Sequence, residues 1–489
     1  MSFYKSAVAG ATAENVNKPF GIKDKLAYAA GDVGCNMSFA LNSYLLYFWT
    51  EYMGISMAHW AIIILALKIW DAINDPVIGG LMDAMKPKPG QSKFKPWIFW
   101  GSLVLIFSGA LCFVPIPSAP YAVKIVICVV GYLLWDMSYT VVNVPYGSLN
   151  SVISTNGEER AALSTFRSLG AFAANIVLMM VIPALAYDTA GRLQGEIMII
   201  IGAVAGVCGF FMFQFLCRGT TERVVVDYEA QKKEANQNYF KSLGAFLKNR
   251  AAVALTLAAI FQLMATAFMS ALSSIYIRIA FPQFSQMSGI ISLFSFLPMF
   301  VAIPFITKAV KKWGKRDASA WPYILGIIGG VLLLAVPAEK TPGIAGLILW
   351  MLPALFVGLS IAVNSLVGWA MVADCIDYQE VRTGVREEGV VYATYSLGRK
   401  LAQGFGASLV AALLGLTGYV AENMNAGIPQ APGTDANIRM LLGAAYLICF
   451  AGMFVLTKFV YPLGKKEVAE VTAKLGRDNN NLIGKNDEE

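Results

Sequence analysis

Four polar residues interrupt an otherwise apolar stretch of the chain near residues 57 to 84: Lys68, Asp71, Asn74 and Asp75. Their spacing of three or four residues places them on one face of a helix. Two carboxylates one turn apart repel each other unless a cation binds between them or a proton neutralises one of them. Asp71, Asp75 and the amide of Asn74 offer oxygen ligands for Na⁺, and a permanent salt bridge between Lys68 and Asp71 is the structural alternative.

Further polar residues stand in other apolar stretches, and several are spaced one helical turn apart. Asp32 with Asn36, and Tyr139 with Asn143, each share a helix face. Hydroxyls, amides and single charges flanked by aromatic rings suit a ligand rich in hydroxyl groups. Hydrogen bonding between neighbouring helices is the alternative for the two asparagines. Single charges of the same class are Arg167, Arg399 and Lys400.

The composition indicates that a lipid bilayer surrounds the elements that carry these residues. Of 489 residues, 57% are hydrophobic and 14% are charged, and the mean hydropathy is +0.59. Soluble globular domains have a larger charged fraction. A charge in the centre of a spanning helix costs about 2.5 to 3.5 kcal/mol on insertion scales, so we expect the charged residues named above to be functional.

Apolar runs of spanning length predict an all-α polytopic membrane protein with 12 transmembrane helices in two sets of six. We expect a cytoplasmic N-terminal segment (1–25), two six-helix bundles (26–217 and 250–462), a cytoplasmic linker (218–249) and a cytoplasmic tail (463–489). Weak similarity between the halves suggests pseudo-symmetric repeats, which place a substrate site at mid-membrane between them. The runs lie near 26–50, 57–84, 97–115, 121–149, 165–187, 196–217, 250–276, 284–309, 321–337, 343–372, 389–417 and 437–462.

The distribution of basic residues predicts the orientation in the membrane. Short loops rich in lysine stay on the cytoplasmic side, and such loops follow the runs that end near 84, 309 and 462. The N-terminal residues lack the apolar core and cleavage site of a secretory signal. We therefore expect a multi-pass protein of the plasma (inner) membrane with both termini in the cytoplasm. We also expect a monomer.

Charged residues also gather at the predicted cytoplasmic ends of the helices. Opposite charges there are expected to latch the two halves together in one conformation, and solvation of ordinary helix ends is the alternative. The residues expected to act as gates are Asp83, Asp374, Asp377, Glu380 and Arg386.

Several other functional classes lack support in the sequence. An intramembrane enzyme is disfavoured because His59 is the lone histidine and there is no HExxH motif, P-loop or cluster of metal ligands. The seven cysteines form no CxxC pair and are interpreted as free thiols. The net charge of +7 is divided among loops, which argues against nucleic-acid binding. We expect no cofactor.

Four motifs in order resemble the glycoside-pentoside-hexuronide:cation symporter family, and the resemblance extends over residues 22 to 462. They are WDAINDP at 70–76, KFKPW at 93–97, YTVVNVPYGSL at 139–149 and MVADCIDYQE at 371–380. The resemblance implies the major facilitator fold, in which two bundles rock about a central site. By position it implies a cation site at Asp71, Asn74, Asp75 and Thr140, and a sugar site at Asn36, Tyr139, Asn143, Tyr146, Arg167 and Lys400.

Within that family the chain looks more like the glucuronide and xyloside carriers than the melibiose permeases. The latter have Asp where this chain has Asn36 and Asn143, and Asp32 precedes Asn36 here. A pocket that lacks two carboxylates but keeps Arg167 and Lys400 is more positive, which favours an anionic sugar such as a hexuronide. Na⁺, H⁺ and Li⁺ all remain open as the coupling ion. The alternatives are a transporter of lipid-like or amphipathic solutes and a sensor that binds without transport.

Overall fold

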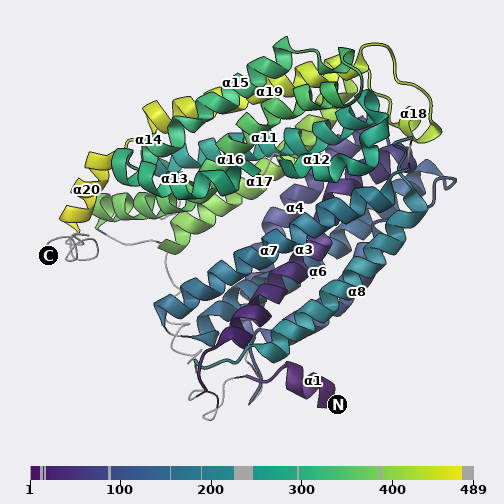
Figure 1. Ribbon diagram of the computed structural model, residues 1–489. Helices are drawn as coiled ribbons and strands as arrows, with labels where there is room; N and C mark the ends of the chain where they lie inside the picture. Colours follow the sequence, from purple (N-terminus) through teal and green to yellow (C-terminus); the bar gives the residue numbers. More distant parts are fainter. Residues whose placement is uncertain are drawn as a thin grey trace. The chain divides into compact units, whose positions relative to one another are not determined.

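The computed structural model is built from helices (Figure 1). It describes residues 2–10, 15, 18–85, 87, 90–154, 156–188, 190–224, 246–294, 297–384 and 388–475. Over these ranges the only strand-like features are two isolated backbone bridges, Ala9 with Gln91 and Tyr187 with Leu193. The predicted all-α class is therefore confirmed.

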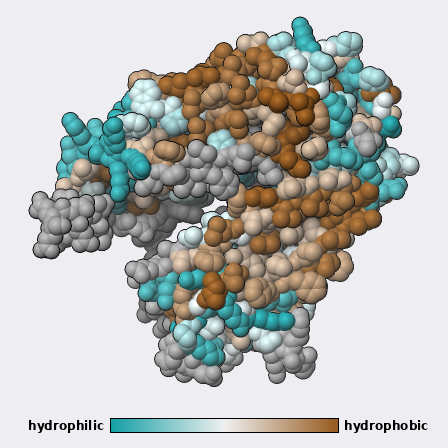
Figure 2. All heavy atoms as spheres, in the orientation of Figure 1, coloured by the Kyte–Doolittle hydropathy of each residue, from teal (hydrophilic) through white to brown (hydrophobic). Residues whose placement is uncertain are grey.

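Seven helical stretches in the described part of the chain are long and apolar enough to cross a membrane. Phe107, Ile348 and Ile448 are 70%, 60% and 65% exposed, which suits contact with lipid tails rather than water. Figure 2 shows hydrophobic residues over the middle of the helices and hydrophilic residues near α14 and α20. The total of twelve crossings stays a prediction. The stretches are Tyr121–Ile153, Ala162–Ala186, Gly195–Gly219, Arg250–Ala280, Lys315–Ala335, Gly343–Thr383 and Thr434–Val460.

The chain divides into two compact units, of which unit 1 comprises Met1–Ala235, Pro282–Ile290 and Tyr419–Ala431. Within it α3 packs against α7 and α8, α5 packs against α6 and α8, and α4 packs against α6. Its elements are α1 (Ser2–Ala7), α3 (Ile22–Tyr47), η1 (Phe48–Tyr52), α4 (Met57–Ala84), α5 (Lys95–Leu111), α6 (Tyr121–Ile153), α7 (Gly157–Ala186), α8 (Gly195–Gly219), η2 (Pro282–Met287) and α18 (Ala421–Ala426).

Two glycines let α3 approach its neighbours closely. A Cβ at Gly170 of α7 would lie 2.5 Å from the carbonyl oxygen of Ala29, so only glycine permits this separation of α3 and α7. A Cβ at Gly31 would lie 2.4 Å from the ring of Tyr146 on α6. Both contacts lie next to Asp32, and they set the position of that carboxylate relative to α6 and α7.

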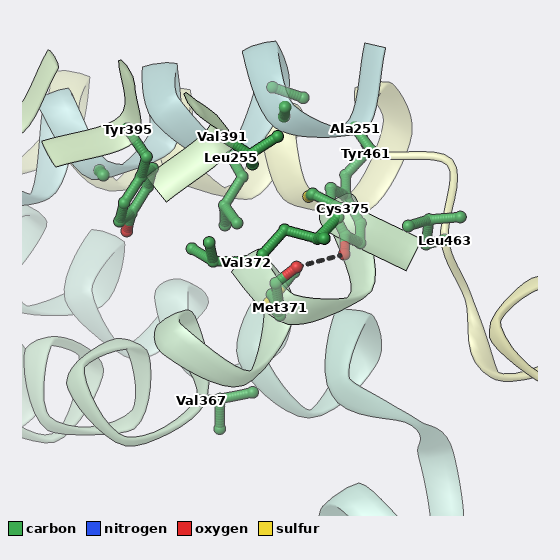
Figure 3. Close-up of a cluster of buried hydrophobic side chains, with 14 of the residues drawn as sticks. Ala251, Leu255, Val367, Met371, Val372, Cys375, Val391, Tyr395, Tyr461 and Leu463 are labelled. Atoms are coloured by element: carbon green, nitrogen blue, oxygen red, sulfur yellow. Dashed lines mark hydrogen bonds between the residues drawn. The ribbon is translucent and has the colours of Figure 1, made fainter. Parts of the chain in front are cut away.

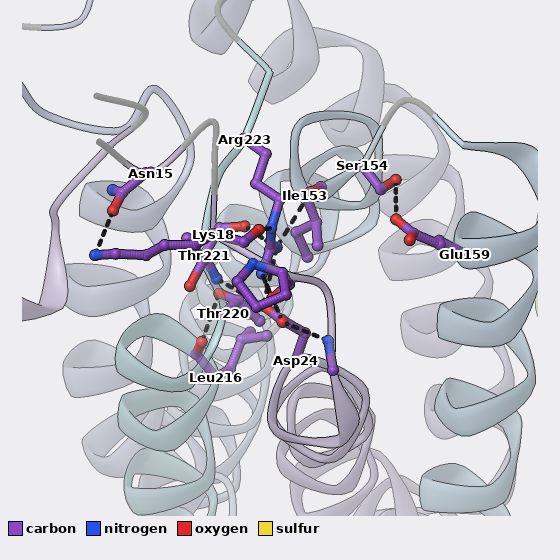
Figure 4. A network of polar contacts seen from close by, with 12 residues as sticks. Asn15, Lys18, Asp24, Ile153, Ser154, Glu159, Leu216, Thr220, Thr221 and Arg223 are labelled. Atoms are coloured by element: carbon purple, nitrogen blue, oxygen red, sulfur yellow. Dashed lines mark hydrogen bonds and ion pairs between the residues drawn. The ribbon is translucent and has the colours of Figure 1, made fainter. Parts of the chain in front are cut away.

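An ion pair ties the start of α3 to the chain that follows α8 (Figure 4). Arg223 Nη2 lies 2.8 Å from Asp24 Oδ2, and Arg223 Nε donates to the carbonyl oxygen of Lys18 at 2.8 Å. The backbone N–H of Thr221 also donates to Asp24 at 2.9 Å. The described first residues of the predicted linker are therefore held on unit 1.

Unit 2 comprises Asn236–Phe281, Ile291–Gly418 and Pro432–Glu489. Its apolar core brings Leu255, Met371, Cys375 and Tyr395 together with Tyr461, whose hydroxyl donates to the carbonyl oxygen of Met371 at 3.4 Å (Figure 3). Its elements are α11 (Arg250–Ala280), α13 (Leu297–Trp313), α14 (Lys315–Ala320), α15 (Pro322–Ala335), η3 (Ala338–Lys340), α16 (Gly343–Thr383), α17 (Glu388–Gly415), α19 (Thr434–Val455), η4 (Leu456–Val460) and α20 (Lys465–Lys474), while α12 (Ser288–Phe294) begins in the chain of unit 1.

A buried ion pair in unit 2 connects α19 to η3. Arg439 of α19 donates from Nε and Nη2 to the two carboxylate oxygens of Glu339, at 2.9 and 3.1 Å, and both side chains are 7% exposed. Tyr276 of α11 donates its hydroxyl to the same carboxylate at 2.9 Å. Burial opposes the charge of Glu339, but the hydrogen bonds from Arg439, the backbone and Tyr276 outweigh burial and lower its pKa.

Replacing Glu339 with Gln is expected to destabilise unit 2 at neutral pH, because Arg439 then remains buried without its counter-charge. Breaking such a pair costs on the order of 3 kcal/mol. Because the native pKa of Glu339 is lowered, the pair's contribution is complete above the ordinary value of 4.5 and is lost as the pH falls toward the native value. Thermal unfolding of wild type and variant at pH 7 and at about pH 3 measures this difference. The exposed Glu470→Gln is the control, and an equal shift in both variants would contradict the assignment.

Candidate functional site

The predicted cation ligands lie where α4 packs against α6. Asp71, Asn74 and Thr140 are buried, and Asp75 is half-buried. The hydroxyl of Thr140 donates to Asp75 Oδ1 at 3.0 Å. Asp75 of α4 and Thr140 of α6 thus bring two oxygen atoms together, although the residues are 65 positions apart in the sequence.

Lys68 lies close to Asp71, as the structural alternative requires. Its Nζ is 3.5 Å from Asp71 Oδ2 and 5.6 Å from the centre of the Tyr132 ring. A separation of 3.5 Å is long for a charge-assisted hydrogen bond. One turn further along, the Nδ2 of Asn74 is buried without a hydrogen-bond partner among the described residues. The ammonium therefore offsets part of the charge of Asp71, while the amide of Asn74 retains unused polar capacity.

A second cluster of predicted residues lies where α3, α6 and α7 meet. Arg167 Nε donates to Asp32 Oδ1 at 3.0 Å, across 135 residues of sequence. The Asp32 side chain is 12% exposed, whereas that of Arg167 is 36% exposed. The carboxylate therefore neutralises the guanidinium and orients it, and part of the guanidinium stays accessible.

The two asparagines of the predicted sugar site have different surroundings. Asn36 donates from Nδ2 to the carbonyl oxygen of Asp32 at 2.8 Å, and its Oδ1 accepts from Asn175 Nδ2 at 2.8 Å. Asn143 Oδ1 accepts from the thiol of Cys35 at 3.8 Å. Asn175, on α7, was missed in the sequence interpretation. The sequence feature that could have identified Asn175 is its amide side chain inside an apolar run, two helical turns after Arg167.

The two tyrosines of the site also differ. Tyr139 is half-buried, and its ring stacks on Trp135 with 5.8 Å between ring centres. Tyr146 is fully buried, and its hydroxyl donates to the carbonyl oxygen of Tyr28 at 2.8 Å. The guanidinium of Arg167 lies 4.9 Å from the centre of the Tyr146 ring, within cation–π range. The ring of Tyr139 also has Phe39 as a neighbour, with 6.0 Å between ring centres, whereas Tyr146 supports Arg167.

The remaining predicted sugar-site residue, Lys400, is half-buried on α17 of unit 2, next to Arg399. Unit 2 also contains a buried chain of amides that the sequence interpretation missed. Asn364 donates from Nδ2 to Gln262 Oε1 at 2.5 Å, and Gln262 donates from Nε2 to the hydroxyl of Ser365 at 3.2 Å. Two amides inside apolar runs were the signal that could have found it.

The predicted gating residues are only partly described. Lys315 Nζ lies 2.6 Å from Asp374 Oδ1 and links α14 to α16 inside unit 2. Asp377 and Glu380 follow on the same helix and have polar interactions of their own. The side chain of Asp83, and Arg386 altogether, lie outside the part of the chain that the structure describes.

Among the described residues, no group of three or more His, Cys, Asp and Glu is arranged to hold a metal ion. The Asp75–Thr140 contact has a different character, since it combines a carboxylate with a neutral hydroxyl. Mixed oxygen donors of this kind suit a hard monovalent cation, and the carboxylate also suits a proton.

The chain is similar to known membrane transporters. The chain is 26% identical over 466 residues to the glucuronide carrier protein homolog of Escherichia coli (strain K12), covering 94% of this chain and 96% of that protein. It is 25% identical over 462 residues to the putative glycoside/cation symporter YagG of the same organism, covering 93% and 95%. The crystal structure of a D-xylose-proton symporter matches with a TM-score of 0.60 at 12% identity, over 90% of this chain and 97% of that one, and shows the fold alone.

These neighbours are membrane transporters, so the expectation that the chain is not an enzyme is confirmed. The family model described as "MFS/sugar transport protein" matches residues 27–465. The resemblance found in the four sequence motifs is confirmed as well. The chain is a multi-pass membrane protein that belongs to the MFS/sugar transport protein family, the glycoside-pentoside-hexuronide symporters.

Proposed function

We propose that this protein is a secondary active transporter that carries a glycoside, pentoside or hexuronide sugar together with Na⁺ or H⁺ by alternating access. The observation that carries the proposal is the Asp75–Thr140 contact, which joins α4, the helix of Asp71 and Asn74, to α6. The family membership supports sugar symport, and the carboxylates support the coupling cation.

The cation step rests on charge in the membrane. Asp71 and Asp75 belong to one apolar helix, and each carboxylate there costs free energy unless a positive partner is present. Lys68 supplies part of that partner for Asp71. Asp75, which accepts a hydrogen bond from Thr140, is then the better ligand for Na⁺, Li⁺ or a proton, and we assign it the main coupling role. Asn74 is proposed as a further ligand through its amide oxygen.

The sugar step uses the neighbouring cluster of α3, α6 and α7. Arg167, held by Asp32, presents donors to ligand hydroxyls, while Asn36 and Asn143 supply amide groups. Tyr139 provides an aromatic plane for the apolar face of a sugar ring. Lys400 is assigned to the same binding event, and Tyr146 acts indirectly through Arg167.

Coupling follows if the cation and the sugar both favour the conformation that switches. Cation binding neutralises α4, which packs on α6, and α6 carries Tyr139 and Asn143 of the sugar site. A carrier that holds neither ligand, or both, then switches between its outward-facing and inward-facing conformations. A carrier that holds only one ligand does not. We propose that the gating residues Asp374, Asp377 and Glu380, at the cytoplasmic ends of the helices, shift the equilibrium between these two conformations. We also propose that both chain termini lie in the cytoplasm and that the protein is a monomer in the inner membrane.

Proteoliposomes containing the purified protein test the proposal. We expect an added glycoside, pentoside or glucuronide to dissipate an imposed Na⁺ or pH gradient, and the same gradient to drive uptake of that sugar. Comparison of Na⁺, Li⁺ and H⁺ gradients identifies the coupling ion. Sugar binding without gradient-dependent flux would instead identify a sensor, and flux of amphipathic solutes alone would reject sugar symport.

A further inference from the structure

Two pairs of polar side chains join α3 to α7. Arg167 Nε donates to Asp32 Oδ1 at 3.0 Å, and Asn175 Nδ2 donates to Asn36 Oδ1 at 2.8 Å. The first pair has been assigned to the sugar site, whereas Asn175 has no assigned role. Asp32 and Asn36 lie one helical turn apart on α3. A change at Asn175 therefore reaches Asp32 through a single intervening side chain, that of Asn36.

The close approach of α3 and α7 explains why two short amide side chains meet directly. A Cβ at Gly170 would lie 2.5 Å from the carbonyl oxygen of Ala29, so the two backbones come within a distance that only glycine permits. Small residues that bring helices together, with amides that hydrogen-bond across the contact, are common in membrane proteins. A hydrogen bond that only joins the helices is thus the alternative to a role in the sugar site.

The hydrogen bonds around Asn175 run in one direction only. Asn175 Nδ2 donates to the carbonyl oxygen of Ala171 at 2.9 Å, and a carbonyl oxygen can only accept. The same nitrogen uses its second hydrogen to donate to Asn36 Oδ1. Both donors of the Asn175 amide are thereby used. The side of the Asn36 amide that faces α7 must then be its oxygen, because an N–H group there would meet another donor.

The nitrogen of the Asn36 amide faces Asp32. Asn36 Nδ2 donates to the carbonyl oxygen of Asp32 at 2.8 Å and to Asp32 Oδ2 at 3.4 Å. If the amide turned over, its oxygen would face these two acceptors and both hydrogen bonds would be lost. Asn175 therefore favours the orientation in which Asn36 supports the carboxylate that binds Arg167.

This arrangement also determines what Asn36 offers to a ligand. Its Nδ2 is turned to Asp32, and one lone pair of its Oδ1 accepts from Asn175. The second lone pair of Oδ1 remains, so Asn36 accepts a hydrogen bond from a ligand hydroxyl. Arg167, whose side chain is 36% exposed, supplies donors instead. The site thus presents an acceptor and a donor whose orientations depend on one chain of hydrogen bonds.

We propose that Asn175 is a positioning residue of the sugar site. It holds the Asn36 amide with its oxygen toward a ligand hydroxyl and its nitrogen on Asp32, the carboxylate that binds Arg167. This rests on the proposed transport of a sugar and adds a residue that sets the direction of hydrogen bonding in the site. Since Asn175 acts through Asn36, its contribution disappears when the Asn36 amide is removed.

Binding of methyl β-xyloside and methyl β-glucuronide to the purified full-length protein, with thermal unfolding of the same samples, tests the proposal. Asn175→Leu, similar in size but without donors, is expected to weaken binding of the sugar that the wild type binds by about tenfold, because the Asn36 amide is then free to turn. Asn175→Asp should weaken it at least as much, since a carboxylate cannot donate to Asn36 Oδ1. Asn175→Gln keeps both donors and should recover part of the affinity.

Met179→Leu is the matched control, because Met179 is half-buried one turn further along α7 and carries no amide. It should leave the affinity unchanged. An equal loss in Met179→Leu and Asn175→Leu would overturn the proposal, because the effect would then follow from packing on α7. If Asn175→Leu fails to fold, Asn175→Asp and Asn175→Gln carry the comparison.

A double-mutant cycle separates positioning from a contact that is merely structural. Asn36→Ala alone is expected to weaken binding by about tenfold. Adding Asn175→Leu to it should weaken binding by less than about twofold more. Losses that multiply in the double variant would show that Asn175 acts independently of Asn36 and would reject the positioning role.

Two further outcomes are distinguishable. A lower unfolding temperature in Asn175→Leu with unchanged affinity is the result expected of a hydrogen bond that only joins the helices, and it would refute the positioning role while leaving sugar transport intact. A wild type that binds neither sugar would contradict the proposed transport of sugars, and the positioning role with it.

Discussion

Replacing Asp75 with Asn is expected to abolish cation-driven accumulation of sugar, so that the ratio of internal to external sugar falls to about 1 in the presence of a gradient. The amide keeps the size of the side chain and its contact with Thr140 but cannot take up a proton or pair with Na⁺. Without a cation site, binding of the two ligands is no longer coupled. Gradient-driven uptake and sugar exchange at equilibrium, measured side by side in proteoliposomes, separate loss of coupling from loss of folding.

The matched control is Glu196→Gln, which neutralises an exposed carboxylate in the first turn of α8. It should accumulate sugar like the wild type. Thr140→Val, which removes one oxygen but no charge, should weaken cation affinity without abolishing accumulation. Full accumulation by Asp75→Asn would remove that residue from the coupling role, and a matching loss in Glu196→Gln would show that the effect is not specific.

Separating Asp32 from Arg167 is expected to reduce both the stability of the protein and its sugar binding. Asp32→Asn leaves the guanidinium without its counter-charge, and Arg167→Gln leaves a carboxylate that is 12% exposed without its donor. Breaking a fully buried pair costs about 3 to 5 kcal/mol, and because Arg167 is 36% exposed we expect about 1 to 2 kcal/mol here. Each single variant should also lose most of its sugar binding, since the donors that contact the ligand are no longer oriented.

A double-mutant cycle distinguishes these effects. The double variant Asp32→Asn with Arg167→Gln should recover thermal stability, because neither charge is then left alone, but it should not recover sugar binding. Arg192→Gln is the control, since its ion pair with Asp188 is 3.7 Å long and both side chains are exposed, at 47% and 36%. We expect less than about 0.5 kcal/mol from that change. Additive losses in the cycle would show that Asp32 and Arg167 do not act as a pair.

The structure changes how the charge of the sugar site is understood. The sequence interpretation attributed a positive pocket to Arg167 and Lys400, but Asp32 accepts a hydrogen bond from Arg167 at 3.0 Å. That contact joins residues 135 positions apart, and no local spacing rule predicts it. Arg399, which the sequence interpretation grouped with Arg167 and Lys400 as a single charge in an apolar run, contacts the rings of Trp369 and Tyr395.

The sequence by itself determined the helical membrane class, the family and the set of candidate residues. Hydropathy and composition indicate whether lipid or water surrounds a helix, and spacings of three and four residues show which side chains share a helix face. The proximity of Lys68 to Asp71 could therefore be predicted from the sequence. Only the tertiary structure decided which faces meet. Thr140 reaches Asp75, Asn175 reaches Asn36, and Tyr146 is buried under Arg167, because helix packing at particular glycines sets distances that the sequence does not encode locally.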